Sequence, residues 1–246
     1  MKEKIESNRM TAIIVGILFI FAIVMLFLGE SLYRPILDSP DYLDNAYPNK
    51  VVVVTGILLE FTGVPAVVFL SVLLFPILRR YNEALALGYV VFRLFEAALL
   101  SVAYISKLSM INLSQNYLSK GSVDTSYFQY IGGLLQSFDH WAGTQGTIYH
   151  VAFVIGSMIL YYTLYRSKLV PRPISAWGFF AAIALLTGSV LSSMGMFAET
   201  SEIGLELVFA LPIAVAEIML SIWLIVKGFN PSAIASMYAG TDSGEI

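Results

Sequence analysis

The chain has no cysteine and only two histidines, and charged residues make up just 13% of its 246 positions. The absence of cysteine excludes disulfides, thiolate metal sites and cysteine nucleophiles. The formal net charge of -3, with no dense run of Lys or Arg, argues against a nucleic-acid partner. Soluble domains are about one quarter charged, roughly twice the fraction found here. Hydrophobic residues make up 58% and fall in long blocks, which is typical of membrane spans.

Six apolar blocks are long enough to cross a bilayer as helices. They predict an all-α membrane bundle of six transmembrane helices, at about 10–29, 51–78, 84–105, 146–165, 174–197 and 205–226. The expected organisation is an N-terminus at 1–9, one transmembrane domain at 10–228 and a tail at 229–246. A cleaved signal peptide would have a shorter apolar region and a small-residue cleavage site, so we interpret the first block as a span.

The basic residues predict the orientation of this bundle. Nine of them fall on the N-terminal side and four on the other, and Arg93 lies inside the third span. The positive-inside rule therefore places both termini in the cytoplasm. The nine are Lys2, Lys4, Arg9, Arg79, Arg80, Arg166, Lys168, Arg172 and Lys227, and the four are Arg34, Lys50, Lys107 and Lys120.

The longest external segment, 106–145, lies between the third and fourth predicted spans. Within it, Tyr127, Ile131, Leu134, Leu135 and Phe138 recur at helical spacing, whereas Gln129, Gln136 and Asp139 lie off that face. This pattern predicts an amphipathic helix on the outer membrane surface. The alternative is a seventh span at 127–142, which would be short and would break the charge asymmetry.

Five ionisable residues lie within the predicted spans and are the candidate site: Glu60, Arg93, Glu96, His150 and Glu217. A charged side chain at the centre of a membrane helix costs about 2.5 to 3.5 kcal/mol on insertion scales. Counting 1.5 Å per residue from the helix ends places Arg93 and Glu217 near the bilayer midplane. The same count places the other three nearer the outer surface, where Glu60 and His150 would form an outer gate.

The charges of these residues leave two interpretations open. Three carboxylates face one guanidinium, and Arg93 can neutralise only one of them, either Glu96 at i+3 or Glu217 across the bundle. In the structural interpretation the remaining carboxyl groups are neutral and hydrogen-bonded between helices. In the functional interpretation they form a proton, metal or cationic-ligand site, the usual assumption for ionisable residues in a membrane.

Metal and cofactor sites are not indicated. Glu60, Glu96 and His150 offer three zinc ligands, but no HExxH or comparable spacing accompanies them, so we predict neither a metal nor a cofactor. Small residues form faces on two helices, at Ala184, Gly188, Ser192 and Gly195 in the fifth span and at Gly56 and Gly63 in the second. Such faces allow close helix packing and make oligomerisation possible.

Several short segments resemble one bacterial family of unknown activity, called domain of unknown function 4386. They are YRS at 165–167, PR at 171–172, WLIVKG at 223–228, FR at 92–93 and EA at 96–97. The resemblance covers about 10–230. It implies six helices in a bacterial or archaeal cell membrane, and it carries no activity. Where the family usually runs Pro-Arg-x-Leu-Gly, this chain has PRPIS at 171–175, a departure in the inner turn.

Three functions follow as hypotheses. The leading one is a membrane protein that handles an ion, a proton or a small ligand in a buried polar cavity, with Arg93 as the charge clamp. The second is an intramembrane enzyme that uses the same carboxylates as acid and base on a lipid or isoprenoid. The third is an accessory subunit whose polar pairs only hold helices together. Expected partners are the lipid bilayer and a small molecule or cation.

Overall fold

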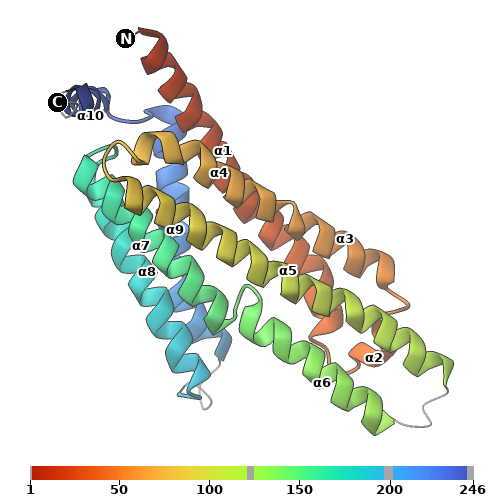
Figure 1. Cartoon of the computed structure of the whole chain (residues 1–246). Helices are drawn as coiled ribbons and strands as arrows, with labels where there is room; N and C mark the ends of the chain where they lie inside the picture. The colour runs from red at the N-terminus through yellow and green to blue at the C-terminus, as the bar shows by residue number, and fades with distance from the viewer. Residues whose placement is uncertain (1, 121–124, 197–201, 243–246) are drawn as a thin grey trace. The chain divides into compact units, whose positions relative to one another are not determined.

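The computed structural model describes residues 2–120, 125–196 and 202–242, and the side chains of 8–120, 125–196 and 208–238. These residues form ten helices and no strand (Figure 1). The helices are α1 (Lys2–Leu37), α2 (Tyr42–Asn45), α3 (Lys50–Phe61), α4 (Gly63–Leu78), α5 (Glu83–Ser119), α6 (Thr125–Ala142), α7 (Thr147–Ser167), α8 (Arg172–Ser193), α9 (Glu202–Val226) and α10 (Pro231–Asp242).

Six helical segments within the described residues are long and apolar enough to cross a membrane. They are Asn8–Leu37, Lys50–Leu78, Glu83–Ser119, Thr125–Ser167, Arg172–Ser193 and Val208–Val226. The prediction of an all-α bundle with six spans is confirmed. The orientation of the termini stays a prediction.

The chain divides into two compact units. The first unit comprises Met1–Ile20, Ala66–Glu96 and His150–Ile246, and the second comprises Phe21–Pro65 and Ala97–Tyr149. α1, α4, α5 and α7 each contribute residues to both units.

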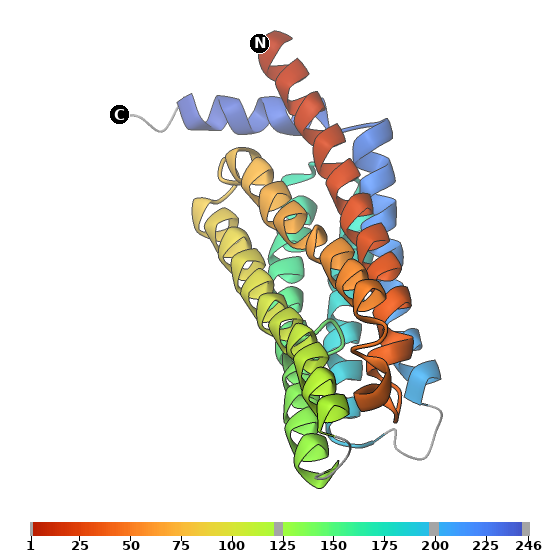
Figure 2. The same ribbon diagram turned by 90° about the vertical axis from the view of Figure 1, so that its right-hand side faces the viewer.

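In the first unit, α1 packs closely against α9. A Cβ atom on Gly16 would lie 2.7 Å from the carbonyl oxygen of Ser221, so only glycine allows this approach. Two turns before it, the guanidinium of Arg9 donates to the carbonyls of Leu224 at 2.9 Å and Ile225 at 2.6 Å. Arg9 thereby satisfies acceptors that the C-terminus of α9 leaves without helical partners. Beyond this end, α10 runs crosswise to α9 (Figure 2).

In the second unit, α1 and α3 cross at two glycines. A Cβ on Gly29 would lie 2.5 Å from the Gly56 carbonyl oxygen, and a Cβ on Gly56 would lie 2.7 Å from that of Gly29. The connection between these helices is held by Ser114 of α5, whose hydroxyl donates to the Leu43 carbonyl at 2.6 Å and accepts from the Tyr47 amide at 2.9 Å. The small-residue face of the second span is therefore used within the chain.

Three helices differ in extent from the prediction. The first span does not end at residue 29, because α1 continues to Leu37. The third span does not end at residue 105, because α5 continues to Ser119 with Lys107 and Ser114 buried. The second span is interrupted at Thr62, between α3 and α4. Pro65 lies in the first turn of α4, where its missing N–H cannot continue the hydrogen bonding of α3. Both α1, with 36 residues, and α5, with 37, exceed a ~30 Å hydrocarbon core at 1.5 Å per residue.

α6 occupies the segment where the sequence predicts an amphipathic outer helix, but a different face packs. Leu134 and Phe138 are exposed, together with Tyr130 and Trp141. Two of the three polar residues expected to face water turn inward: Gln136 donates to the Leu37 carbonyl at 3.4 Å, and Asp139 forms an ion pair, whereas Gln129 is exposed. An apolar outer face is what a helix in contact with lipid requires. The location of α6 on the outer membrane surface stays a prediction.

Candidate functional site

Two buried polar clusters stand out, one in each unit. We call the first, in the first unit, the arginine cluster: Arg93, Glu96 and Glu217. Arg93 is only 1% exposed, and its Nη1 lies 2.9 Å from Oε2 of Glu96, within hydrogen-bond distance. Its Nη2 lies 3.9 Å from Oε1 of Glu217. Both carboxylates named as possible partners from the sequence therefore reach the same guanidinium.

The helices explain this geometry. Arg93 and Glu96 are three residues apart on α5, the spacing that places two side chains on one face. Glu217 comes from α9. The rings of Tyr89 and Phe153 lie 5.4 and 5.1 Å from the guanidinium carbon, which suits cation–π contacts in a site that excludes water. Arg93 is thus held by two carboxylates and two aromatic rings.

The lysine cluster lies in the second unit and comprises Tyr33, Glu60, Lys107 and Asp139. The Tyr33 hydroxyl donates to Oε2 of Glu60 at 2.6 Å, and Nζ of Lys107 donates to the same hydroxyl at 3.0 Å. Lys107 also lies 2.9 Å from Oδ1 of Asp139. The four side chains form one unbroken series of polar contacts contributed by α1, α3, α5 and α6.

Burial falls along this series. Tyr33, Glu60 and Lys107 are each at most 2% exposed, whereas the Asp139 side chain is 26% exposed. The rings of Tyr33 and Tyr104 lie 4.6 and 5.5 Å from Nζ of Lys107. Asp139 is therefore the end of the series that solvent can reach.

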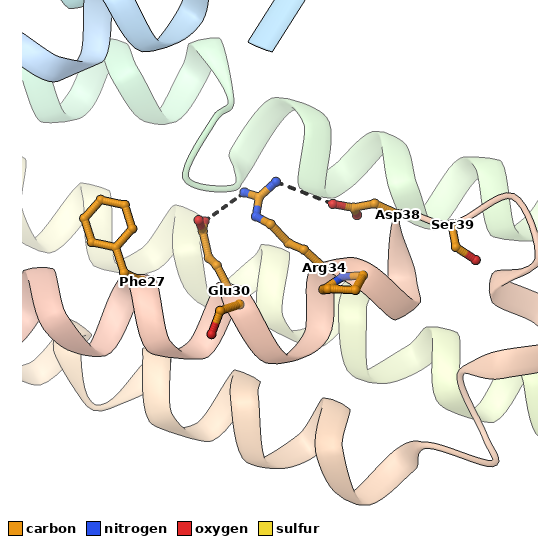
Figure 3. Close-up of a pocket in the computed structure, with 7 residues that line it drawn as sticks. Phe27, Glu30, Arg34, Asp38 and Ser39 are labelled. Atoms are coloured by element: carbon orange, nitrogen blue, oxygen red, sulfur yellow. Dashed lines mark hydrogen bonds and ion pairs between the residues drawn. The ribbon is translucent and has the colours of Figure 1, made fainter. Parts of the chain in front are cut away.

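A third polar network, outside the two clusters, lies on the last turns of α1 and just beyond them (Figure 3). Arg34 pairs with Glu30 at 2.8 Å and with Asp38 at 3.5 Å, and the Thr144 hydroxyl donates to Glu30 at 2.5 Å. Glu30, Arg34 and Asp38 line a cavity of about 490 Å³ together with Phe27, Ser31, Pro35 and Ser39. Burial raises the pKa of Asp38 above its usual value, and the neighbouring Arg34 opposes this effect.

Three of the five predicted residues contact one another within one unit. Arg93, Glu96 and Glu217 come together, but Glu60 belongs to the lysine cluster of the other unit. His150 lies in the first unit, where its Nδ1 is 2.8 Å from the Ser189 hydroxyl. Glu60 accepts from Tyr33 and His150 contacts Ser189, and their role as an outer gate stays a prediction. Within the described residues, no three His, Asp or Glu side chains are grouped to hold a metal ion.

The sequence reasoning missed most of the lysine cluster. Lys107 was assigned to the outer side because the third helix was expected to end at 105, and Asp139 was assigned to the wet face of its helix. One signal was available: Lys107 follows Glu96 by eleven residues, three helical turns, so both lie on one face of α5. No local pattern connects Tyr33 with Glu60, which is 27 residues away.

The fold and its two buried ionic clusters define a multi-pass helical membrane protein. The sequence profile of a family described as domain of unknown function (DUF4386) matches residues 14–228. The chain therefore belongs to this family. Searches of curated proteins and of solved structures found no match.

Proposed function

We propose that the protein handles protons in the membrane, using the two buried clusters as proton-binding sites. The observation that carries the proposal is the charge count: each cluster holds one cation and two carboxylates. Arg93 faces Glu96 and Glu217, and Lys107 faces Asp139 and, through Tyr33, Glu60. With every group ionised, each cluster has an excess charge of −1 in a low-dielectric interior. Binding one proton removes that charge.

In the lysine cluster, the series of contacts offers a proton a route. The Lys107 ammonium gives a proton to the Tyr33 hydroxyl as Tyr33 gives its own proton to the buried Glu60. A proton that arrives at the partly exposed Asp139 then passes to the neutral Lys107 amine and restores its charge. A tyrosine hydroxyl both donates and accepts, so Tyr33 can pass a proton on as it receives another. We assign Glu60 as the proton acceptor and Tyr33 as the relay.

In the arginine cluster, Glu217 is the better proton acceptor. Glu96 is held by Arg93 at hydrogen-bond distance, whereas Glu217 lies 1.0 Å further away, at 3.9 against 2.9 Å. The Glu217 side chain is also more accessible, 14% exposed against 3% for Glu96. Nearby, the buried Tyr161 hydroxyl has no hydrogen-bond partner within the described residues. An unpaired buried hydroxyl costs about 1 to 3 kcal/mol, so a bound polar group beside Glu217 would be stabilised.

A small cation could bind to either cluster in place of the proton, because it would cancel the same excess negative charge. We also place the protein in the cell membrane of a bacterium or archaeon, as the family implies. On the positive-inside expectation both termini are cytoplasmic.

The test is proton flux into proteoliposomes that contain a pH-sensitive dye. A potassium gradient with valinomycin supplies an inside-negative potential, and the unmodified protein should acidify the interior faster than protein-free liposomes. Glu60→Gln, Tyr33→Phe and Glu217→Gln should each lower the rate by roughly tenfold or more, the scale on which positioned acid–base groups contribute. Glu83→Gln, at the exposed start of α5, is the matched control and should leave the rate unchanged.

Two results would contradict the proposal. One is a rate for the unmodified protein equal to that of protein-free liposomes, with or without an added sodium gradient. The other is an unchanged rate in all three variants. If the variants only lowered stability, the clusters would be interhelical contacts of an accessory subunit.

A further inference from the structure

A second cavity, unrelated to the two clusters, lies in the first unit where two turns meet. Its volume is about 590 Å³, within the usual range of ligand sites. The α7–α8 turn and the α9–α10 turn form it. Its lining consists of Lys168, Leu169, Val170, Pro171, Arg172, Trp223, Lys227, Gly228, Phe229, Asn230 and Pro231.

The two turns are fixed to each other. The Asn230 amide donates to the Leu169 carbonyl at 2.9 Å, and the Asn230 side chain donates to the Lys168 carbonyl at 3.3 Å. Gly228 has φ 77°, and a Cβ there would lie 2.8 Å from Nη1 of Arg9. Lys168 has φ 59°, the one positive φ among the described non-glycine residues. The cavity therefore has a defined shape before any ligand binds.

The cavity is basic at its rim and apolar at its base. Lys168, Arg172 and Lys227 are exposed, and within the described part of the chain none of them forms an ion pair. Leu169 and Phe229 are buried. No carboxylate lines the cavity, so nothing in it neutralises three cations. α8 and α10 also begin here, and the N-terminal end of a helix attracts anions.

We infer that this cavity binds the phosphate of an anionic phospholipid headgroup. Three cations around a cavity suit a phosphate diester, and the planar guanidinium of Arg172 can hold two of its oxygens. The apolar base and Trp223 point to a lipid rather than a soluble phosphate, because tryptophan is enriched where chain and headgroup regions meet. Basic pockets between helices on the cytoplasmic side are suited to such headgroups, and these residues are predicted to lie on that side.

The test uses the full chain, freed of lipid in detergent, with native mass spectrometry and thermal unfolding as readouts. The probes are phosphatidylglycerol, zwitterionic phosphatidylcholine and inorganic phosphate. We expect one phosphatidylglycerol to bind in preference to phosphatidylcholine and to raise the unfolding temperature. Lys168→Gln with Arg172→Gln should weaken phosphatidylglycerol binding by roughly 25-fold, about fivefold for each cation lost near a membrane surface.

Arg79→Gln with Arg80→Gln is the matched control. It removes the same charge from the α4–α5 turn, which is predicted to lie on the same side of the membrane and does not line the cavity. Equal weakening in both double variants would overturn the inference, because it would show diffuse attraction to the basic surface. Absence of any preference for phosphatidylglycerol would also overturn it. An equal rise in unfolding temperature with inorganic phosphate would support the phosphate site and assign it to a soluble anion.

Discussion

Replacing Arg93 by methionine should destabilise the folded protein strongly at neutral pH. Methionine keeps most of the volume and can still pack against the rings of Tyr89 and Phe153, so the loss is mainly one of charge, including the cation–π part of these contacts. Glu96, hydrogen-bonded to Arg93 at 2.9 Å, would remain buried with no cation beside it. Breaking a buried pair in this way costs about 3 to 5 kcal/mol in soluble proteins, and polar contacts are often weaker in membranes.

The loss of unfolding free energy caused by Arg93→Met has an upper limit that depends on pH. Glu96 can escape its penalty by taking up a proton, which at pH 7 costs about 1.36 × (7 − 4.3), or about 3.7 kcal/mol, for a glutamate of ordinary pKa. We therefore expect Arg93→Met to cost about 2 to 3.7 kcal/mol at pH 7. The cost should shrink by up to about 1.4 kcal/mol for each unit that the pH is lowered towards 4.3.

Double variants identify the partner that matters. Arg93→Met with Glu96→Gln should recover more than half of the loss, because it removes the fully buried carboxylate. The pair with Glu217→Gln should recover less, since Glu217 is 3.9 Å from Arg93 and partly accessible. The measurement is equilibrium unfolding in mixed micelles, with the exposed Arg79→Met as the control. If Arg93→Met unfolds like the unmodified protein at pH 7, or if its cost does not change with pH, the reasoning is wrong.

Three further predictions concern the other unit and the orientation. Tyr33→Phe should lower the free energy of unfolding by about 1 to 3 kcal/mol, because it removes the hydroxyl that donates to the buried Glu60. A loss below about 0.5 kcal/mol, the lower limit for one hydrogen bond, would count against the assignment of Tyr33 as the relay. Gly29→Ala should destabilise the crossing of α1 and α3, whereas Gly63→Ala should be tolerated, because its added Cβ would meet no atom closer than 3.5 Å. Equal unfolding curves for the two variants would contradict this prediction. Reporter fusions after Lys168 should read cytoplasmic and those within 38–49 external, and the reverse result would invert the orientation.

The fold class was predictable because membrane spans are encoded locally. A run of apolar residues about twenty long has few other stable states, so the six spans follow from hydropathy alone. The pair of Arg93 and Glu96 was equally accessible, since i+3 spacing on a helix determines proximity. Glu217 is matched to Arg93 in the sequence only by estimated depth in the bilayer, and in the structure the two side chains lie 3.9 Å apart.

The lysine cluster was not predictable in the same way. Ser106 and Lys107 resemble the end of a span, and hydropathy cannot distinguish a helix that leaves the membrane from one that continues against other protein segments. The buried positions Tyr104, Lys107, Ile111 and Ser114 do keep a helical repeat that would have extended the helix. In α6 the same limit applies: an amphipathic pattern identifies two faces without saying which one packs. Where lipid is the outside solvent, the polar face turns inward.

At Lys168, which has a left-handed backbone, a substitution that stabilises the fold would remove a positive charge from the rim of the cavity. Any residue other than glycine pays about 1 to 2 kcal/mol for this conformation, so Lys168→Gly should raise the unfolding temperature while removing a rim cation. A selection for thermostable variants would therefore favour the loss of this lysine, and a selection for lipid dependence would oppose it. A screen of variants for thermal stability alone would therefore select against Lys168, a residue proposed to bind the lipid phosphate.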